Sequence, residues 1–520
     1  MRVEMRDAIL LIDAEMTQNS FGRRSKKTIF LVEQMRRVQI ILGPPGTGKT
    51  TTLLNIVEDA ISRGIKPERI AYLAFTRKAA SEAQERAMAQ FNLDEKRFPY
   101  FRTLHSLAFK QLSLQRDEVM TSNHYRKFGK EMGINFKGIY DEVLGFSLGD
   151  GVGDKCSRIE SLARMGLRTM EQQYDLENIS DLNLHAVKQY HNSLLKYKKD
   201  NGVLDFTDML QKYDSELDID ICIIDEAQDL SSIQYKMAIK VASLAQEIYI
   251  AGDDDQAIFG WAGADVSKFL NLKGDRMILP QSFRIPRSVH KLAADVVQRI
   301  KNRIPKPWQP RSENGFVDYV VNEQEIDFRK KGTWMLLARS KYLTNRLIRA
   351  VRQQGLAYSI NNKSSLESDE TRAITSWERL RKGVAINLHD AKNIIQFLGI
   401  SVNLRELETY TIESLGLPEA SKQFDWMKML KGIAPDEREY LRSCLHNGEK
   451  FTKKPRINIS TIHQSKGGEA DNLVLLTDMN SKSWDNLGND EENRVWYVAL
   501  TRAKENLFIV RPRTLKSFNI

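Results

Sequence analysis

The residues with the clearest chemical potential form one run, Gly43-Pro44-Pro45-Gly46-Thr47-Gly48-Lys49-Thr50. The run fits the P-loop pattern G-x-x-x-x-G-K-[ST], with an apolar stretch before it and a helical pattern after it. In such a loop, backbone N–H groups wrap phosphates, the lysine reaches the β and γ phosphates and the hydroxyl binds Mg²⁺. We therefore predict a nucleotide site with Lys49 as a catalytic residue and Thr50 as a metal ligand. The predicted phosphate-binding residues are Gly43, Pro44, Pro45, Gly46, Thr47, Gly48, Lys49, Thr50 and Thr51.

An acidic pair, Asp225-Glu226, directly follows the apolar run 221–224. Ligands of open α/β sheets bind at the carboxyl ends of the strands, so this pair is expected beside the P-loop. Asp225 is predicted to hold Mg²⁺, and Glu226 is predicted to polarise the water that attacks a γ-phosphate. The alternative interpretation of either acid alone is a solvated loop residue. Together with the P-loop, the pair favours nucleotide hydrolysis.

These motifs need strands and helices to position them, and the apolar pattern supplies both. Short apolar runs that end at polar or glycine-rich turns predict buried parallel strands. A helix is predicted at 51–61, where Leu53, Leu54 and Val57 recur at helical spacing. Alternation of strands and helices predicts α/β layers. The predicted strands are 38–42, 70–75, 219–224, 248–251, 473–476 and 507–510.

Composition narrows the class of protein. The chain has 520 residues, which favours two to four domains, and a net charge of +10, which favours a polyanionic partner. Its three cysteines, Cys156, Cys222 and Cys444, form no CxxC pair and predict no disulfide framework or metal cluster. No apolar run is long enough for a membrane span, and the first eleven residues carry four charges. We expect no membrane partner and a cytoplasmic location.

Further motifs resemble those of UvrD/Rep/PcrA-like superfamily 1 DNA helicases. They are Asp225-Glu226-Ala227-Gln228-Asp229 (motif II), Gly252-Asp253-Asp254-Asp255-Gln256-Ala257-Ile258-Phe259-Gly260-Trp261 (III), Phe75-Thr76-Arg77-Lys78-Ala79-Ala80 (Ia), Thr103-Leu104-His105-Ser106 (Ib), Gln281-Ser282-Phe283-Arg284 (IV), Thr461-Ile462-His463-Gln464-Ser465-Lys466-Gly467-Gly468-Glu469 (V) and Tyr497-Val498-Ala499-Leu500-Thr501-Arg502-Ala503-Lys504 (VI). The resemblance runs from about residue 34 to 510, apart from two insertions.

The resemblance implies an α/β fold of two RecA-like P-loop NTPase cores, with parallel sheets flanked by helices and a mostly helical insertion in each core. The expected division is 1–108 (core 1, first part), 109–201 (insertion 1B), 202–278 (core 1, second part), 279–363 (core 2, first part), 364–451 (insertion 2B, reduced) and 452–520 (core 2, second part). The proline-rich segment 305–310 is expected as an ordered loop within the second core.

The resemblance also implies roles for residues around ATP. Arg284 and Arg502 are expected to contact the γ-phosphate, so that hydrolysis depends on closure between the cores. Gln256 is expected to sense the γ-phosphate. Phe283, in place of the family's usual tyrosine, is expected to stack on adenine, and Glu469 to bond the ribose. Gln34 and Gln18 both lie upstream of the P-loop, and Gln34 is the candidate for reading adenine.

Single strands are held by basic grooves and by aromatic faces on which bases stack. By resemblance, the predicted DNA-binding residues are Phe75, Thr76, His105, Phe206, Phe259, Trp261 and His463. Two basic clusters, Lys196, Lys198 and Lys199 and then Lys453, Lys454 and Arg456, fit a solvated helix face or a phosphate grip equally well.

The chain departs from the family pattern in two places. Ala262 stands where the family usually has arginine, which removes a DNA contact beside Trp261. The interval between Arg284 and Thr461 is shorter than the family's large second insertion leads us to expect, so that regulatory subdomain is reduced or replaced.

The leading hypothesis is an ATP-dependent DNA helicase or translocase that uses ATP and Mg²⁺ and, by resemblance, moves 3′ to 5′ on single-stranded DNA. Single-strand/duplex junctions and replication or repair proteins are the expected partners. The alternative is an ATP-regulated DNA-binding switch or accessory motor without processive unwinding. An RNA-directed or purely structural P-loop protein is the third interpretation.

Overall fold

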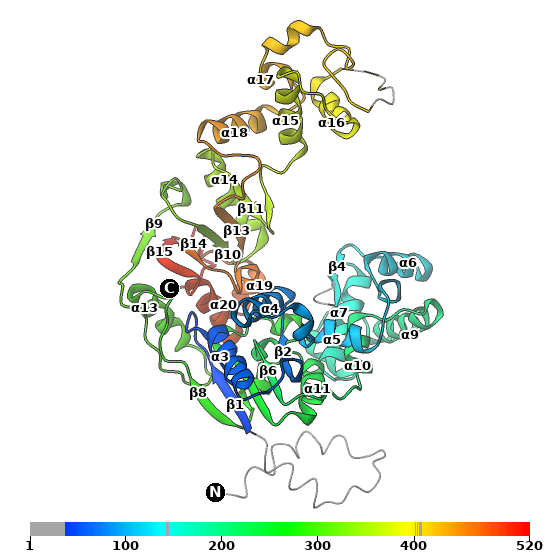
Figure 1. The fold of residues 1–520 in the computed structure, drawn as a ribbon, viewed down its shortest axis with the longest axis vertical. Coiled ribbons are helices and arrows are strands. Elements are labelled where there is room, and N and C mark those ends of the chain that lie inside the picture. The colour runs from blue at the N-terminus through cyan, green and yellow to red at the C-terminus, as the bar shows by residue number, and fades with distance from the viewer. Residues whose placement is uncertain (1–36, 142–144, 401, 403, 405–407) are drawn as a thin grey trace, which may run out of the picture. The chain divides into compact units, whose positions relative to one another are not determined.

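The computed structural model describes residues 37–141, 145–400, 402, 404 and 408–520. These residues form two compact units (Figure 1). Unit 1 comprises the described chain up to Arg284 together with Ile300–Arg311, and unit 2 comprises Ile285–Arg299 and Ser312–Ile520. The chain therefore passes between the units three times, after Arg284, Arg299 and Arg311. Gln34 and Gln18 lie outside the described residues.

Unit 1 is built on a six-stranded sheet in the order β3-β2-β6-β7-β1-β8. All of its strand pairs are parallel. Strands buried on both faces need apolar side chains in both directions, which is why these segments read as nearly continuous apolar runs. The strands are β1 (Arg37–Leu42), β2 (Ile70–Ala74), β3 (Phe101–Thr103), β6 (Ile221–Ile224), β7 (Glu247–Gly252) and β8 (Asp275–Ile278).

Helices cover both faces of this sheet. Ile41 points into a core shared with α3 and α4, whereas its neighbours Ile40 and Leu42 point into a second core with α5, α10, α11 and α12. This alternation follows from the two-residue period of a strand. The helices are α3 (Lys49–Ser62), α4 (Arg77–Phe91), α5 (Leu104–Gln111), α10 (Phe206–Lys212), α11 (Ser232–Val241) and α12 (Val266–Leu270).

The chain between α5 and α10 forms the first insertion, with a small core of its own around Phe128, Tyr190 and Leu194. The sequence predicts a mostly helical insertion without strand runs, and the structure adds an antiparallel hairpin of two short strands. Three-residue strands are too short to give a periodic signal. The elements are α6 (Ser122–Met132), β4 (Ile139–Asp141), β5 (Phe146–Leu148), α7 (Val152–Met165), α8 (Met170–Glu177) and α9 (Leu184–Asn201).

Unit 2 contains a seven-stranded sheet in the order β12-β11-β13-β10-β14-β15-β9. Only the short β11–β12 pair is antiparallel. The strands are β9 (Phe316–Val320), β10 (Trp334–Ala338), β11 (Tyr358–Ile360), β12 (Lys363–Ser364), β13 (Ile457–Thr461), β14 (Ala470–Leu476) and β15 (Ala503–Val510). The helices of this core are α13 (Arg287–Val297), α14 (Thr344–Gln353), α19 (Ser481–Asp485) and α20 (Asp490–Leu500).

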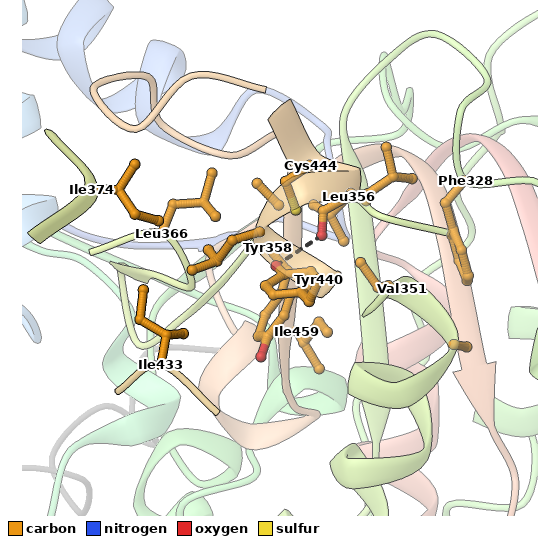
Figure 2. Packing of buried hydrophobic residues seen from close by; sticks show 14 of the residues in the cluster. Phe328, Val351, Leu356, Tyr358, Leu366, Ile374, Ile433, Tyr440, Cys444 and Ile459 are labelled. Carbon is orange, nitrogen blue, oxygen red and sulfur yellow. Dashed lines mark hydrogen bonds between the residues drawn. The ribbon is translucent and has the colours of Figure 1, made fainter. Parts of the chain in front are cut away.

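The second insertion shares its hydrophobic core with the sheet of unit 2. Figure 2 shows Tyr440 and Cys444 packed among residues from the sheet and from the insertion, and the Tyr440 hydroxyl donates to the Leu356 carbonyl at 3.1 Å. One cluster of buried side chains runs from Ile459 on β13 to Trp377 on α15. The helices are α15 (Asp369–Arg381), α16 (Leu388–Leu398), α17 (Trp426–Met429) and α18 (Pro435–His446).

The fold prediction of α/β cores with parallel sheets flanked by helices is confirmed, and each of the six predicted strands overlaps an observed parallel strand. The expectation for segment 305–310 is wrong, because Ile300–Arg311 belongs to unit 1. The physical reason is ionic: Lys306 in this segment is buried against acidic residues that follow β7. Among the described residues, the helices include none with the length and apolar character of a membrane span.

The shared core predicts that the second insertion contributes to the stability of unit 2. Leu441→Ala on α18 removes a fully buried side chain and should lower the free energy of unfolding by about 2–5 kcal/mol in denaturant titrations. Leu445→Ala on the same helix, where the side chain is 38% exposed, is the matched control and should change it by at most about 0.5 kcal/mol. Equal effects of the two variants would contradict a shared core.

Candidate active site

The P-loop joins β1 to α3 and is shaped by close backbone approach. Gly46 and Gly48 have φ values of 72° and 77°, a conformation that favours glycine. A Cβ at Gly46 would lie 2.3 Å from the Cβ of Arg284, so this glycine is also required by space. Thr47 Oγ1 donates to the Pro44 carbonyl at 2.8 Å and closes the turn. The first turn of α3 carries no acidic residue, and its N–H groups suit an anion.

Lys49 lies against the acidic pair at the end of β6. Its Nζ donates to Glu226 Oε1 and lies 3.6 Å from Asp225 Oδ1. Burial alone would lower the pKa of Lys49, but the carboxylates of Glu226 and Asp225 raise it above its usual value. Lys49 is therefore a fixed positive charge. The structure brings Lys49, Asp225 and Glu226, three of the predicted catalytic residues, together in one unit.

Asp225 and Glu226 differ in their surroundings. Asp225 is buried, accepts a hydrogen bond from the Tyr72 hydroxyl at 2.8 Å and has its pKa raised by burial, an effect that Lys49 opposes. Glu226 is half-buried and adopts a left-handed backbone conformation with φ of 54°. Such conformations are strained for a non-glycine residue and concentrate at functional sites. This one aims the carboxylate at Lys49.

Gln228 was not predicted from the sequence, and it links the ends of two strands. Its Nε2 donates to Glu226 Oε2 at 2.6 Å, and its Oε1 accepts from the backbone N–H of Asp253 at 3.0 Å. A Cβ at Gly252 would lie 2.5 Å from this amide oxygen, so Gly252 leaves room for the link. Nothing local in the sequence shows that Gln228, rather than its acidic neighbours, reaches β7.

The segment after β7 carries the predicted γ-phosphate sensor. Gln256 Nε2 donates to Asp253 Oδ2 at 2.7 Å. Asp253 is fully buried, and burial raises its pKa to about 6, an effect that Lys306 opposes. Lys306 and Arg303, which also contact this segment, were not predicted from the sequence.

The segment Ser282–Arg284 lies on the P-loop within unit 1. The Ser282 hydroxyl donates to the Pro45 carbonyl at 2.7 Å, and the Phe283 N–H donates to the Gly46 carbonyl at 2.8 Å. The Phe283 side chain is 72% exposed, and a Cβ at Gly48 would lie 3.8 Å from its ring. The predicted adenine-stacking residue therefore offers an open aromatic face beside the phosphate loop.

Two pairs of aromatic side chains lie in unit 1. Phe75, after β2, stacks on Phe259, after β7, with ring centroids 5.8 Å apart. His105, on α5, meets Phe206 edge-on at 5.7 Å. Burial lowers the pKa of His105 to about 4, and Arg77 adds to this effect. His105 is therefore neutral near pH 7 and packs against Phe206.

The remaining predicted DNA-binding residues of unit 1 lie at helix starts and in a tight turn. The Thr76 hydroxyl caps α4 by accepting from the Ala79 N–H at 3.1 Å. Trp261 sits in a short 3₁₀ turn whose carbonyl accepts from Arg158 of the first insertion at 3.5 Å. Thr76 follows β2 and Trp261 follows β7, and their contacts with DNA stay predictions.

Of the first basic cluster, Lys196, Lys198 and Lys199, Lys198 is a structural residue. Neither a solvated helix face nor a phosphate grip describes its side chain. It is buried, and its Nζ pairs with Asp205 and Asp208 at 2.7 Å each, whereas Lys196 and Lys199 are exposed. Arg164 pairs with the same two acids. Burial alone would raise the pKa of Asp205, but Arg164 and Lys198 hold it below its usual value.

This ionic cluster also positions an aromatic residue. Asp205 caps α10, which begins at Phe206, and its side chain accepts from the Asp208 N–H at 2.7 Å. Because Arg164 lies on α7 and Lys198 on α9, the first insertion fixes the start of α10 through buried charges.

Unit 2 carries Arg502, His463 and Glu469 on the loops around β13 and β14. Arg502 is buried, and its guanidinium donates to the carbonyls of Val498 at 2.9 Å and Gly468 at 3.1 Å. Glu469, the next residue after Gly468, is exposed. Burial lowers the pKa of His463 to about 3, with Arg339 and Lys466 adding to the effect. Arg502 lies between α20 and β15, and its guanidinium reaches the β13–β14 loop that carries the predicted ribose-binding residue.

The second basic cluster, which precedes β13, is divided in the same way as the first. Arg456 donates to the carbonyls of Phe328 and, at 2.8 Å, Lys330, whereas Lys453 and Lys454 are exposed. In this cluster, therefore, only the exposed side chains of Lys453 and Lys454 are candidates for binding a phosphate.

The fold and the site define a P-loop NTPase with two RecA-like cores. The defining features are the P-loop at the end of β1, the Asp-Glu pair at the end of β6 and the two sheets of mostly parallel strands flanked by helices. Comparison with known proteins agrees and is more specific. The chain belongs to the UvrD/Rep helicase family: residues 26–276 match the UvrD/REP helicase N-terminal domain, and residues 438–513 match the UvrD-like helicase C-terminal domain.

Relatives cover most of the chain at low identity. A putative ATP-dependent DNA helicase YjcD of Bacillus subtilis is 22% identical over 91% of this chain and 76% of its own length. The ATP-dependent DNA helicase Rep of Buchnera aphidicola is 22% identical over 90% of this chain and 92% of its own length. The ATP-dependent DNA helicase PcrA of Staphylococcus epidermidis is 20% identical over 92% of this chain and 82% of its own length.

The contact between Gly46 and Arg284 generates a test. Gly46→Ala should weaken ATP binding at least about tenfold in fluorescence titrations, because the new Cβ displaces either the P-loop or the Arg284 segment. Gly64→Ala is the matched control, since Gly64 also has a positive φ but nothing within 4 Å of a new Cβ. If both variants bind nucleotide equally well, the close approach has no role in the site.

The lowered pKa of His105 predicts a pH dependence of stability. The unfolded chain protonates histidine near pH 6.5, whereas the folded chain resists protonation down to about pH 4. Stability from this residue is therefore complete above pH 6.5 and is lost as the pH falls. His105→Gln should show a smaller loss of unfolding free energy between about pH 7 and about pH 5 than wild type, with the exposed His446→Gln as control. If the free energy of unfolding of His105→Gln depends on pH as steeply as that of wild type, the lowered pKa of His105 is contradicted.

Proposed function

We propose that this chain is an ATP-dependent DNA helicase or translocase that hydrolyses ATP to move along single-stranded DNA and separate duplex strands. The observation that carries the proposal is that Lys49, Asp225 and Glu226 meet at strand ends of the same sheet whose strands β2 and β7 lead into the Phe75–Phe259 pair. One edge of one sheet thus presents groups suited to a triphosphate and groups suited to stacked bases.

The residues present fit Mg²⁺ bound together with ATP. Mg²⁺ in nucleotide sites takes one or two protein oxygens and completes its shell with phosphate oxygens and water. Thr50 and the buried Asp225 would supply those oxygens, and among the described residues no cluster of three acidic, histidine or cysteine ligands competes with them. When bound, the ion neutralises charge on the β and γ phosphates.

The protein groups have distinct tasks in hydrolysis. The P-loop amides and Lys49 hold the phosphates, which draws Lys49 away from Glu226. The released Glu226 accepts a proton from water as its oxygen attacks the γ-phosphorus, and the bond to the β-phosphate oxygen breaks to give ADP and phosphate. Gln256 contacts the γ-phosphate, Arg284 and Arg502 stabilise its developing charge, Phe283 stacks on adenine and Glu469 bonds the ribose.

The aromatic pairs supply the grip on DNA. A base sandwiched between two rings needs them about 7 Å apart, so Phe75 and Phe259 at 5.8 Å must separate to admit a base. Phe206, Trp261, Thr76, His105 and His463 complete the proposed track. Movement from 3′ to 5′, preference for single-strand/duplex junctions, replication or repair partners and a cytoplasmic location remain predictions.

The proposal predicts ATP hydrolysis that single-stranded DNA stimulates many-fold. Glu226→Gln keeps the shape of the side chain but removes the proton acceptor, so it should lower kcat at least about a hundredfold while ATP still binds. Lys49→Ala should weaken binding as well. Phosphate-release assays with and without DNA measure both, and equal turnover without DNA would count against the proposal.

Strand separation distinguishes the motor from a DNA-binding switch. The replacement of the expected arginine by Ala262 beside Trp261 favours a weaker grip and keeps the switch as a second candidate. Duplexes with a 3′ or a 5′ single-stranded tail should be separated by the motor from the 3′ tail only. Hydrolysis without separation of either substrate would support the switch instead.

A further inference from the structure

One segment of unit 1 contacts both the acidic residues beside the predicted sensor Gln256 and the backbone of Pro280 and Ser282, which leads onto the P-loop, although it belongs to neither motif. This segment, Ile300–Arg311, is called the strap here. It follows α13 of unit 2, returns to unit 1 and leaves again after Arg311. Its first half lies on the acidic residues after β7, and its second half pairs with the chain that leads to Arg284.

The first half of the strap is held by charge. Arg303 forms a two-pronged pair with Asp255, with N···O distances of 2.8 and 2.7 Å. The Ile304 N–H donates to Asp254 Oδ2 at 2.9 Å. Paired, two-pronged contacts of this kind fix orientation as well as distance.

Lys306 is the centre of this contact. Its side chain is only 1% exposed, and Nζ lies 2.5 Å from Asp254 Oδ1, 2.9 Å from Asp255 Oδ2 and 3.2 Å from Asp253 Oδ1. It also donates to the Ile304 carbonyl of the strap at 3.1 Å. Burial alone would lower the pKa of Lys306, but the three carboxylates raise it above its usual value, so it is a permanent charge.

Asp253 connects Lys306 to the predicted sensor of the γ-phosphate. One carboxylate oxygen of Asp253 faces Lys306, and the other accepts from Gln256 Nε2 at 2.7 Å. The Asp253 backbone is held by Gln228, which also contacts Glu226. Lys306 therefore acts on Gln256 through one intervening side chain.

The second half of the strap holds the arginine-bearing segment. The Gln309 N–H donates to the Pro280 carbonyl at 2.7 Å, and the Ser282 N–H donates to the Gln309 carbonyl at 2.9 Å. Ser282 in turn donates to the Pro45 carbonyl of the P-loop. The same short segment thus fixes Gln256 at one end and the backbone before Phe283 and Arg284 at the other.

We propose that Lys306 is a positioning residue: through the strap, it holds the sensor Gln256 and the segment carrying Arg284 in one rigid arrangement around the P-loop, so that the site distinguishes triphosphate from diphosphate. This proposal rests on the proposed function in one respect only, the contact of Gln256 with the γ-phosphate. Lys306 itself does not contact the nucleotide.

The test compares equilibrium affinities for ADP and for a non-hydrolysable ATP analogue, measured by fluorescence titration without DNA. The decisive variant is Lys306→Met with Asp254→Asn, which removes one positive and one negative charge and leaves the net charge of the buried cluster unchanged. This balance protects folding, because an unpaired buried charge is what destabilises. Lys306→Arg retains the charge, and Lys301→Met is the matched control at an exposed lysine of the strap.

Wild type should bind the ATP analogue more tightly than ADP. In the double variant the ratio of the two affinities should fall about tenfold, because a hydrogen bond to a charged group contributes about that factor to an equilibrium constant. Its ADP affinity should stay within about twofold, because the P-loop is intact. Lys306→Arg should restore part of the preference, and Lys301→Met should keep all of it.

If Lys306 has a merely structural role, the double variant should have a lower melting temperature or bind both nucleotides more weakly by the same factor. An unchanged ratio of the two affinities would therefore overturn the proposal. A wild-type protein without preference for triphosphate would overturn it as well. Failure of the proposed function looks different: hydrolysis would ignore DNA, or tailed duplexes would stay intact, while the affinity ratio still responded to Lys306.

Discussion

Compensation of buried charge within unit 1 is the constraint on which the rest of the site depends. Lys49 faces Asp225 and Glu226, Lys306 faces three aspartates, and Lys198 with Arg164 faces Asp205 and Asp208. A buried charge without a partner costs several kcal/mol, so each group is fixed by the others. Pairing between these buried charges therefore fixes the positions of the functional side chains.

The same constraint ties the proposed general base to the proposed phosphate-binding lysine. Lys49 donates to Glu226, so the two side chains share one ion pair. In the proposed function, the charge of a triphosphate competes with Glu226 for Lys49, so binding of the substrate frees the carboxylate that accepts a proton from water. Coupling of this kind needs no separate switch, only carboxylates that lie within reach of one lysine.

The two insertions play different structural parts. The first has its own small core, and it is joined to the sheet of unit 1 through charges that cap α10, through Arg158 at the Trp261 turn and through the buried side chain of Met165. The second continues the hydrophobic core of the unit 2 sheet, as the packing around Tyr440 shows (Figure 2). The first insertion therefore combines ion pairs with apolar contact, whereas the second shares one continuous apolar core with its sheet.

The sequence by itself determined the local features: apolar runs became parallel strands, the P-loop formed between β1 and α3, and Asp225-Glu226 appeared at the end of β6. These features depend on residues close together in the chain, where period and turn chemistry are readable. Short strands such as β3 and β4 left too few residues for a period. Only the tertiary structure decided which distant charges meet, as with Lys306 and Asp254 or Lys198 and Asp205. A lysine carries no local mark of its future partner, because burial and pairing arise from packing between segments far apart in sequence.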